Sequence, residues 1–412
     1  MQVIDCAVVG AGPAGLAASV ALAGRGVDHV VLERDRVAGT WRAQRWDSFR
    51  LNTAGWMNTM LDGQERDAYA PGGEVIEGLE RIAAGCPVRE GVRVTRLAAA
   101  GDGWALATDD GELRARTVVV AAGDQNVPRV PALAGRLPDR VAQLHAAGYR
   151  GPAQLPEGAV LVVGSAQSGC QIAEDLLAGG RRVVLATSPA GRVPFRHRGR
   201  DILEWLIEVG FMDQRPKDLP DPAMMKATMP IIAPGRGLSL PALARSGATL
   251  AGRPVAVDGE RLAFDDSAAA NLAAGDAFAA RVRATVDELI QRRGLDAPRP
   301  SPTSTTAPSA STPRPTSTWG PPRSAAWSGA PGSPATSPGW TRPWPAPTAC
   351  PGTPTAPPPP PACGIWGCAG CAVAAPASST ASAATPPGPP GRSGPTWAAE
   401  PLYRNASSPP AR

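Results

Sequence analysis

The sequence predicts an α/β fold with two strand–turn–helix units, followed by an irregular tail rich in Pro, Ala and Ser. Two glycine motifs support this prediction: Gly10–Gly15 follows the apolar run Val3–Val9, and Gly164–Gly169 follows Val160–Val163. One such motif alone is a weak signal. Two of them, each between a predicted strand and a predicted helix, indicate two Rossmann-like dinucleotide-binding domains in one chain. Electron transfer between the two dinucleotides is the simplest reason for binding both.

The first domain is expected to span residues 1–150. Residues 1–35 predict a β-α-β unit, with its helix at Gly15–Gly24 and its second strand at His29–Glu33. Three further strands are expected, of which the middle pair alternates as an antiparallel hairpin does; they are Val92–Leu97, Trp104–Thr108 and Leu113–Ala121.

The second domain is expected to span residues 151–297. A proline-rich connector at 124–157 leads into a second β-α-β unit at Val160–Ala186. Two further helices are expected at Asp201–Val209 and Ala273–Arg293.

Residues 298–412 differ in composition from the rest of the chain. They hold 30 of the 47 prolines and no phenylalanine, so they lack the apolar surface that would offset the entropy of ordering. This composition predicts a disordered tail. The tail also holds seven arginines and one acid, which leaves 34 basic and 35 acidic residues before it. The basic character therefore belongs to the tail, and residues 1–297 do not indicate a nucleic-acid-binding protein.

The sequence also predicts the location of the protein and whether it binds a metal. No apolar run is long enough to span a bilayer, and no signal peptide is expected because Asp5 interrupts the first apolar run. Three scattered cysteines in residues 1–297 (Cys6, Cys86 and Cys170) favour a reducing, cytoplasmic location. No metal is expected, because residues 1–297 contain no cluster with the spacing of metal ligands.

The glycines of the first motif have distinct roles. Gly10 allows a tight turn, Gly12 lets the backbone approach a pyrophosphate, and Gly15 lets the helix pack on the strand. An acid at the end of the second strand accepts hydrogen bonds from ribose hydroxyls, and Glu33 has this position. The alternative is a glycine turn that binds nothing. The predicted dinucleotide contacts are Gly10, Gly12, Pro13, Ala14, Gly15 and Glu33.

Three motifs follow the first β-α-β unit in order: Gly39-Thr40-Trp41, the run Arg45–Asn52, and Val118–Gly123 ahead of Pro128 and Pro131. Together they resemble bacterial flavin-containing monooxygenases, and most of all the flavoproteins linked by name to cation efflux and potassium transport. The resemblance covers residues 1 to about 297 and implies an FAD/NAD(P)-binding fold.

The resemblance implies that the first site binds FAD. It implies that Gly39, Thr40 and Trp41 lie along the flavin, although a packing role for Trp41 is an equal alternative. It further implies Asn52 as a catalytic residue that faces the flavin and the nicotinamide. Val94 and Gly123 complete the FAD contacts implied by the resemblance.

The second motif has Ala166 where the middle glycine is usual. Alanine is the smallest such change, so nucleotide binding is still predicted; a degenerate repeat kept only as a scaffold is the alternative. Gly164 and Gly169 keep the turn and the packing. The predicted contacts are Gly164, Ser165, Gln167, Ser168 and Gly169.

The residues after the strand Arg182–Ala186 indicate which nicotinamide cofactor binds. No acid occupies the place equivalent to Glu33, and several arginines follow. A 2′-phosphate pairs well with arginine, which favours NADPH over NADH. The candidate contacts are Ser188, Arg192 and Arg196, with a solvated basic loop as the alternative.

The segment Gln143–Tyr149 resembles the latter half of the monooxygenase fingerprint. In that fingerprint, a histidine and an aromatic residue four positions later, here His145 and Tyr149, mark the linker between the domains. The first half is absent, since Asp139 and Val141 replace the expected phenylalanine and glycine. This departure disfavours a Baeyer–Villiger assignment.

The predicted function is an FAD-dependent oxidoreductase in which NADPH reduces FAD and O2 is used to oxygenate a small substrate. The substrate would be a nitrogen or sulfur nucleophile or a carbonyl compound, and the cofactors would supply the chemistry. A disulfide reductase is disfavoured because residues 1–297 contain no C-x-x-C. A nucleotide-sensing flavoprotein associated with ion transport, or an inactive truncated copy, remain the alternatives.

The tail has a second interpretation, which we prefer: an out-of-frame translation of GC-rich DNA. The third base of each codon can be joined to the first two bases of the next. Residues 326–341 and 366–386 then allow strings that resemble segments near the end of a flavoprotein, in the expected order and in one frame. The alternative is a genuine tail.

Overall fold

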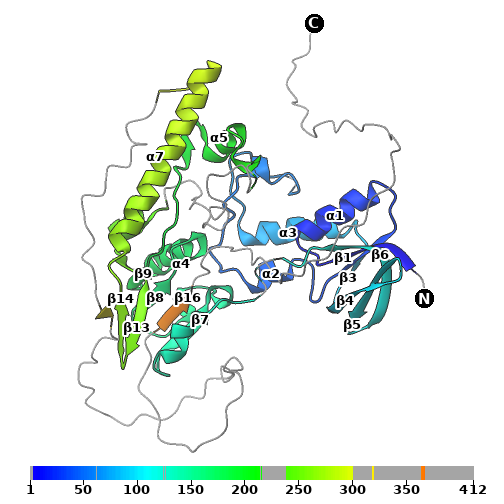
Figure 1. Cartoon of the computed structure of the whole chain (residues 1–412), viewed down its shortest axis with the longest axis horizontal. Coiled ribbons are helices and arrows are strands. Elements are labelled where there is room, and N and C mark those ends of the chain that lie inside the picture. Colours follow the sequence, from blue (N-terminus) through cyan, green and yellow to red (C-terminus); the bar gives the residue numbers. More distant parts are fainter. Residues whose placement is uncertain are drawn as a thin grey trace, which may run out of the picture. The chain divides into compact units, whose positions relative to one another are not determined.

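The computed structural model describes residues 3–61, 63–123, 125, 127–213, 215 and 238–299. It also describes the backbones of residues 318–319 and 363–366 (residue 212 likewise by its backbone alone). These residues form two sheets that are rich in parallel strands, each with helices packed against it (Figure 1). The predicted α/β class is confirmed.

The first sheet has six strands in the order β3-β2-β1-β6-β5-β4. Strands β3, β2, β1 and β6 are parallel neighbours, and β4, β5 and β6 form an antiparallel meander. Helices α1 and α3 contribute Leu16 and Leu79 to the apolar core that contains Val8 of β1. The elements are β1 (Val3–Val9), α1 (Pro13–Ala23), β2 (His29–Leu32), α2 (Gly39–Ala43), α3 (Gly72–Ala83), β3 (Val88–Arg89), β4 (Val94–Ala100), β5 (Gly103–Thr108) and β6 (Gly111–Val120).

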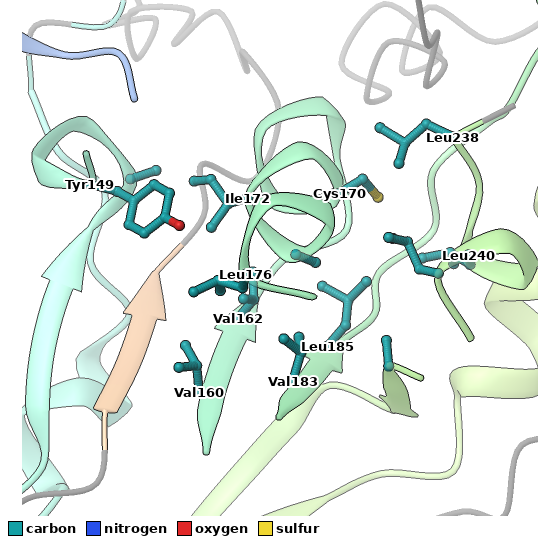
Figure 2. Close-up of a cluster of buried hydrophobic side chains, with 14 of the residues drawn as sticks. Tyr149, Val160, Val162, Cys170, Ile172, Leu176, Val183, Leu185, Leu238 and Leu240 are labelled. Carbon is teal, nitrogen blue, oxygen red and sulfur yellow. The ribbon is translucent and has the colours of Figure 1, made fainter. Parts of the chain in front are cut away.

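The second sheet has five parallel strands in the order β12-β9-β8-β16-β7. Its core gathers side chains from β8, β9 and α4, and Figure 2 shows Tyr149 beside Ile172 and Leu176 within this cluster. The elements are β7 (Ala142–His145), β8 (Val160–Val163), α4 (Gln167–Ala178), β9 (Val183–Ala186), β12 (Thr249–Ala251) and β16 (Cys363–Trp366).

The remaining elements follow the second β-α-β unit. Asp201 caps α5, because its carboxylate accepts a hydrogen bond from the Leu203 amide at 2.8 Å. The long helix α7 ends at Gly294, which has a φ of +60°. The elements are β10 (Arg196–His197), β11 (Arg200–Asp201), α5 (Ile202–Glu208), α6 (Leu240–Arg245), β13 (Pro254–Asp258), β14 (Arg261–Phe264), α7 (Ala268–Arg293) and β15 (Thr318–Trp319), with short 3-10 turns at Gly55–Met57, Ala132–Arg136, Ala146–Gly148, Pro152–Gln154 and Phe211–Asp213.

Two short strands come from the region that composition predicts to be disordered. Strand β15 pairs with β14, and β16 lies between β7 and β8. The expectation of irregular structure does not hold for these six residues, because the open edges of β7 and β8 can accept backbone hydrogen bonds from a strand of almost any sequence. The rest of residues 300–412 lies outside the described residues.

The predicted division of the chain at residues 150 and 297 stays a prediction. Strand β7, which precedes residue 150, pairs within the second sheet. None of the helices in the described ranges is both long and apolar enough to cross a membrane.

Candidate functional site

The first glycine motif forms a tight turn between β1 and α1. Gly10 has a φ of +107°, and a Cβ there would lie 2.5 Å from the Ala121 carbonyl oxygen. A Cβ at Gly15 would lie 1.8 Å from the Gly10 carbonyl oxygen. A Cβ at Gly12 would meet nothing within 4 Å. The fold therefore requires Gly10 and Gly15, whereas the open space at Gly12 is available to a ligand.

The end of β2 is tied to this turn by Glu33. One carboxylate oxygen of Glu33 accepts a hydrogen bond from the Ala11 amide at 2.8 Å, and the other accepts from the Asp35 amide at 3.1 Å. The side chain therefore orients the glycine turn. It also lines the cleft beside that turn, where it could accept hydrogen bonds from ribose hydroxyls.

This cleft has a volume of about 750 Å³ and opens at the carboxyl ends of β1 and β2. Pro13 begins α1 there, so the first-turn amides of the helix point at the cleft, as in many anion-binding sites. Most of the residues predicted to hold a cofactor line it together: Gly10, Gly12, Pro13, Ala14, Glu33, Gly39, Thr40, Trp41, Val94 and Gly123.

Two residues predicted for the FAD site, Gly15 and Asn52, do not line this cleft. Gly15 lies beneath the turn, against the Gly10 carbonyl. Asn52 follows Leu51, whose amide donates to the Ala70 carbonyl oxygen at 2.9 Å, and it is not among the residues that line the cleft. Its catalytic role stays a prediction.

Sequence reasoning missed Arg34, Arg45 and Arg93, which also line the cleft. The guanidinium of Arg45 lies 5.1 Å from the ring centroid of Trp41 and 5.4 Å from that of Phe49. Such cation–π contacts depend on the fold of the loop, so no sequence spacing indicates them. The cleft thus presents three arginines beside the glycine turn, which suits an anionic ligand.

The second glycine motif repeats the backbone of the first. Gly164 has a φ of +101°, and a Cβ at Gly169 would lie 1.9 Å from the Gly164 carbonyl oxygen. Ala166 has φ −77° and ψ −175°, close to the values of −86° and −174° at Gly12. The alanine therefore leaves the turn unchanged, because any residue adopts this conformation.

Ser165 holds the second turn to the residues after β9. Its hydroxyl donates to the Ser188 carbonyl oxygen at 3.1 Å and accepts from the Ser188 amide at 3.0 Å. Ser165 is fully buried. Gln167 and Ser168 begin α4, and the N-terminus of a helix attracts anions.

The two arginines predicted to bind a 2′-phosphate are paired with carboxylates. Arg192 forms an ion pair with Asp276, and its Nε lies 2.7 Å from a carboxylate oxygen. Arg196 lies 2.9 Å from a carboxylate oxygen of Asp67. Their phosphate contacts stay predictions.

The described cysteines do not form a redox pair. Cys6, Cys86 and Cys170 are free thiols. Complete burial, with a smaller effect of Glu174, raises the pKa of the Cys170 thiol to about 12, so this thiol stays protonated at neutral pH. Cys368 and Cys371 lie outside the described residues.

Comparison with known proteins agrees with this geometry. Residues 7–197 match the family model for pyridine nucleotide-disulphide oxidoreductase. The chain is 31% identical over 220 residues to "Uncharacterized oxidoreductase CzcO-like" of Geobacillus kaustophilus, covering 52% of this chain and 62% of the relative. It is 36% identical over 178 residues to "Indole-3-pyruvate monooxygenase YUCCA1" of Oryza sativa subsp. japonica, covering 41% of this chain and 44% of the relative.

Among solved structures, a double mutant of the flavin monooxygenase from Stenotrophomonas maltophilia superposes with a TM-score of 0.50 at 23% identity. The match covers 65% of this chain and 74% of that structure, and at this identity it supports the fold alone. The matched region covers less than two thirds of the length of the two curated relatives named above. The chain thus has the FAD/NAD(P)-binding fold of flavin monooxygenases, and it is similar to the bacterial CzcO-like oxidoreductases.

Proposed function

We propose that this protein is an FAD-dependent monooxygenase that takes its electrons from NADPH and oxygenates a small substrate with O2. The observation that supports this proposal best is the repeated glycine turn. Gly10 and Gly164 have φ values within a few degrees of each other, and the close approaches at Gly15 and Gly169 match as well. Two such turns provide one phosphate-binding place for each dinucleotide.

FAD is proposed for the first cleft because three features line it together. They are open space for a phosphate at Gly12, the carboxylate of Glu33 and the aromatic ring of Trp41. The fit is supported by the open space at Gly12, where a side chain would obstruct a pyrophosphate. When bound, FAD would supply the redox chemistry. The proposed contacts remain Gly10, Gly12, Pro13, Ala14, Gly15, Glu33, Gly39, Thr40, Trp41, Val94 and Gly123, with Asn52 as the proposed catalytic residue.

NADPH is proposed for the second turn. Ala186 ends β9, and the next residues, Thr187 and Ser188, carry no charge, so no carboxylate repels a 2′-phosphate at the place equivalent to Glu33. The protein's own task would be to hold the nicotinamide beside the flavin and to exclude water. The proposed contacts remain Gly164, Ser165, Gln167, Ser168, Gly169, Ser188, Arg192 and Arg196.

The substrate class is proposed as a soft nitrogen or sulfur nucleophile or a carbonyl compound, and the location as cytoplasmic. Chain purified with a verified reading frame is expected to be yellow and to consume NADPH aerobically with an amine or sulfide. Bound FAD without NADPH oxidation across varied acceptors would contradict this proposal and favour the nucleotide-sensing alternative.

We also infer that residues 298–412 are an out-of-frame translation. Besides composition, one structural observation supports this inference: β5 pairs with β6 only from Gly111 to Ala115, so in the described part of the chain Thr117–Val120 has a strand partner on the β1 side alone. Val120 lines the cleft and is 66% exposed, and Val127, seven residues later in the chain, is 82% exposed. Exposed apolar residues beside an open strand edge indicate a missing cover.

The coding DNA tests this inference directly. An inserted or deleted base is expected near codon 298, and resequencing codons 290–310 would reveal it. An intact frame through this region would make the tail genuine and the inference wrong.

A further inference from the structure

We propose that Asp175 is a positioning residue that couples the two nucleotide-binding units of this protein. Asp175 lies on α4, the helix that begins at the second glycine motif. One of its carboxylate oxygens accepts a hydrogen bond from the Tyr149 hydroxyl at 2.6 Å, and the other accepts from the Ser48 hydroxyl at 2.5 Å. One side chain thus holds both the connector before the second unit and the loop beside the first cleft.

The Tyr149 end of this contact is rigid. Tyr149 is fully buried and lies in the same apolar cluster as Ile172 and Leu176 of α4 (Figure 2). Burial and the hydrogen bond to Asp175 raise the pKa of Tyr149 far above its ordinary value, so its hydroxyl stays protonated and donates. Asp175 is therefore anchored to the core of the second unit.

The Ser48 end leads to the first cleft through an aromatic chain. Phe49, the next residue, lies 5.8 Å from Trp41 between ring centroids, and Trp41 lines the cleft. Trp46 lies 5.2 Å from Phe49 and 6.4 Å from Tyr149 between ring centroids. The row of aromatic rings therefore also leads back to Tyr149, the other partner of Asp175. The two contacts of Phe49 are edge-to-face, and the contact between Trp46 and Tyr149 is tilted. Close-packed rings of this kind transmit a displacement.

Backbone hydrogen bonds keep the same loop beside the connector. The Asp47 amide donates to the Arg150 carbonyl oxygen at 2.8 Å. The Arg150 guanidinium donates to the carbonyl oxygens of Ala43 and, at 3.4 Å, of Arg45. A shift of α4 when a nucleotide binds at its N-terminus would therefore reach the loop at residues 43–49, and the Asp175–Ser48 hydrogen bond links α4 to this loop directly.

The inference rests on the proposed function, because coupling matters where a hydride must pass between two bound cofactors. Hydride transfer requires the reacting atoms to lie about 3–3.5 Å apart, so small displacements of one unit affect its rate strongly. Asp175 does not line the first cleft and is not proposed to touch either cofactor. Its role would be to fix where the two units meet.

Amide hydrogen exchange on the 412-residue chain tests the contact without any cofactor. In Ser48→Ala and Asp175→Asn, the amides of residues 44–50 should exchange about tenfold faster than in the parent chain, since one charge-assisted hydrogen bond is lost. Ser48→Thr, which keeps the hydroxyl, and Asp110→Asn, an exposed acid on the β5–β6 turn, should leave exchange there unchanged. Ser48 is exposed, so its variants are expected to fold. Parent-like exchange in Ser48→Ala and Asp175→Asn would overturn the proposal.

Adding NADP⁺ tests the coupling. In the parent chain, NADP⁺ should slow exchange both in the first turn of α4 and at residues 44–50; in Asp175→Asn it should slow α4 alone. Slowing confined to α4 in the parent chain would overturn the coupling while leaving the second nucleotide site in place. Slowing nowhere would instead contradict the proposed second nucleotide site, and the coupling with it.

Discussion

At the scale of single residues, the two glycine motifs separate what the fold needs from what a ligand needs. The outer glycines are enforced by backbone contacts, at 1.8 Å for Gly15 and 1.9 Å for Gly169. The middle position has ordinary dihedral angles in both motifs, which is why Ala166 is tolerated. An alanine at Gly15 should therefore lower the stability of the fold, whereas an alanine at Gly12 should mainly weaken ligand binding.

Gly15→Ala should lower the free energy of unfolding by about 1–3 kcal/mol or more, because its Cβ would overlap the Gly10 carbonyl oxygen. Gly12→Ala should cost less than about 1 kcal/mol of stability, the difference between glycine and alanine at a helix N-cap. It should nevertheless weaken FAD binding at least about tenfold by filling the phosphate place. Urea unfolding and a fluorescence titration with FAD measure the two effects. Equal loss of stability in both variants would count against the assignment of Gly12 to the ligand.

Some residues of the site can be predicted from the sequence, and others cannot. The lining of the first cleft was predictable because Gly10, Gly12 and Glu33 follow local rules of strand, turn and helix. The ion pair of Arg192 was not, because its partner Asp276 lies 84 residues away in the chain. A basic residue near a predicted phosphate site looks the same in sequence whether it binds phosphate or a distant carboxylate.

At the scale of elements, α7 is fixed to the strands before α5 by Asp287. One carboxylate oxygen of Asp287 lies 2.8 Å from Nε2 of His197 and 2.8 Å from Nε of Arg198. Burial alone would raise the pKa of Asp287, but its hydrogen bonds to Arg198 and His197 outweigh burial and hold this pKa below the ordinary value. A lowered carboxyl pKa stabilises the fold above the ordinary pKa, and that stability is lost as the pH falls through the lowered value.

Asp287→Asn should therefore lower the free energy of unfolding near pH 7 by about 1–3 kcal/mol, since it leaves the buried His197 without its charged partner. The difference from the parent chain should shrink as the pH falls below the ordinary carboxyl pKa of about 4 and through the lowered pKa of Asp287. Urea unfolding at several pH values checks this, with Asp266→Asn, an exposed acid just before α7, as the control. A difference that persists unchanged at low pH would show that the ion pair is not its cause.

The elements also show where pattern analysis fails. Strand β1 has the predicted bounds Val3–Val9 because a continuous apolar run next to a glycine turn is a strong signal of a buried parallel strand. Strand β7 was treated as part of a connector, because its four residues, Ala142–His145, are too few to show a period. Helix α7 begins at Ala268, five residues before the predicted start, since alanine-rich sequence offers no sharp boundary.

At the scale of the whole molecule, two β-α-β units repeat, and in the described part of the chain the end of β6 beyond Ala115 has a strand partner on the β1 side alone. The repeated topology, in which β1 and β8 each lie between two parallel strands, follows from the repeated motif in the sequence. What packs beside Val120 could not be predicted, because residues 298–412 are inferred to be read out of frame.

If the frame inference holds, the 412-residue chain should bind FAD at least about tenfold more weakly than a chain with the corrected frame, because the cleft lacks its cover. Exposed valines beside the cleft should also lower its solubility. FAD content after gel filtration and an equilibrium titration measure the first effect for both chains under the same conditions. Equally tight FAD binding by the 412-residue chain would contradict the inference.

The most direct test of the central claim is to mix NADPH anaerobically with purified chain of verified reading frame and to follow its visible absorbance. We expect a yellow protein with one FAD per chain that loses its colour on mixing with either nicotinamide cofactor, and faster with NADPH than with NADH. A colourless protein that binds neither nucleotide, or a flavin that NADPH leaves oxidised, would contradict it.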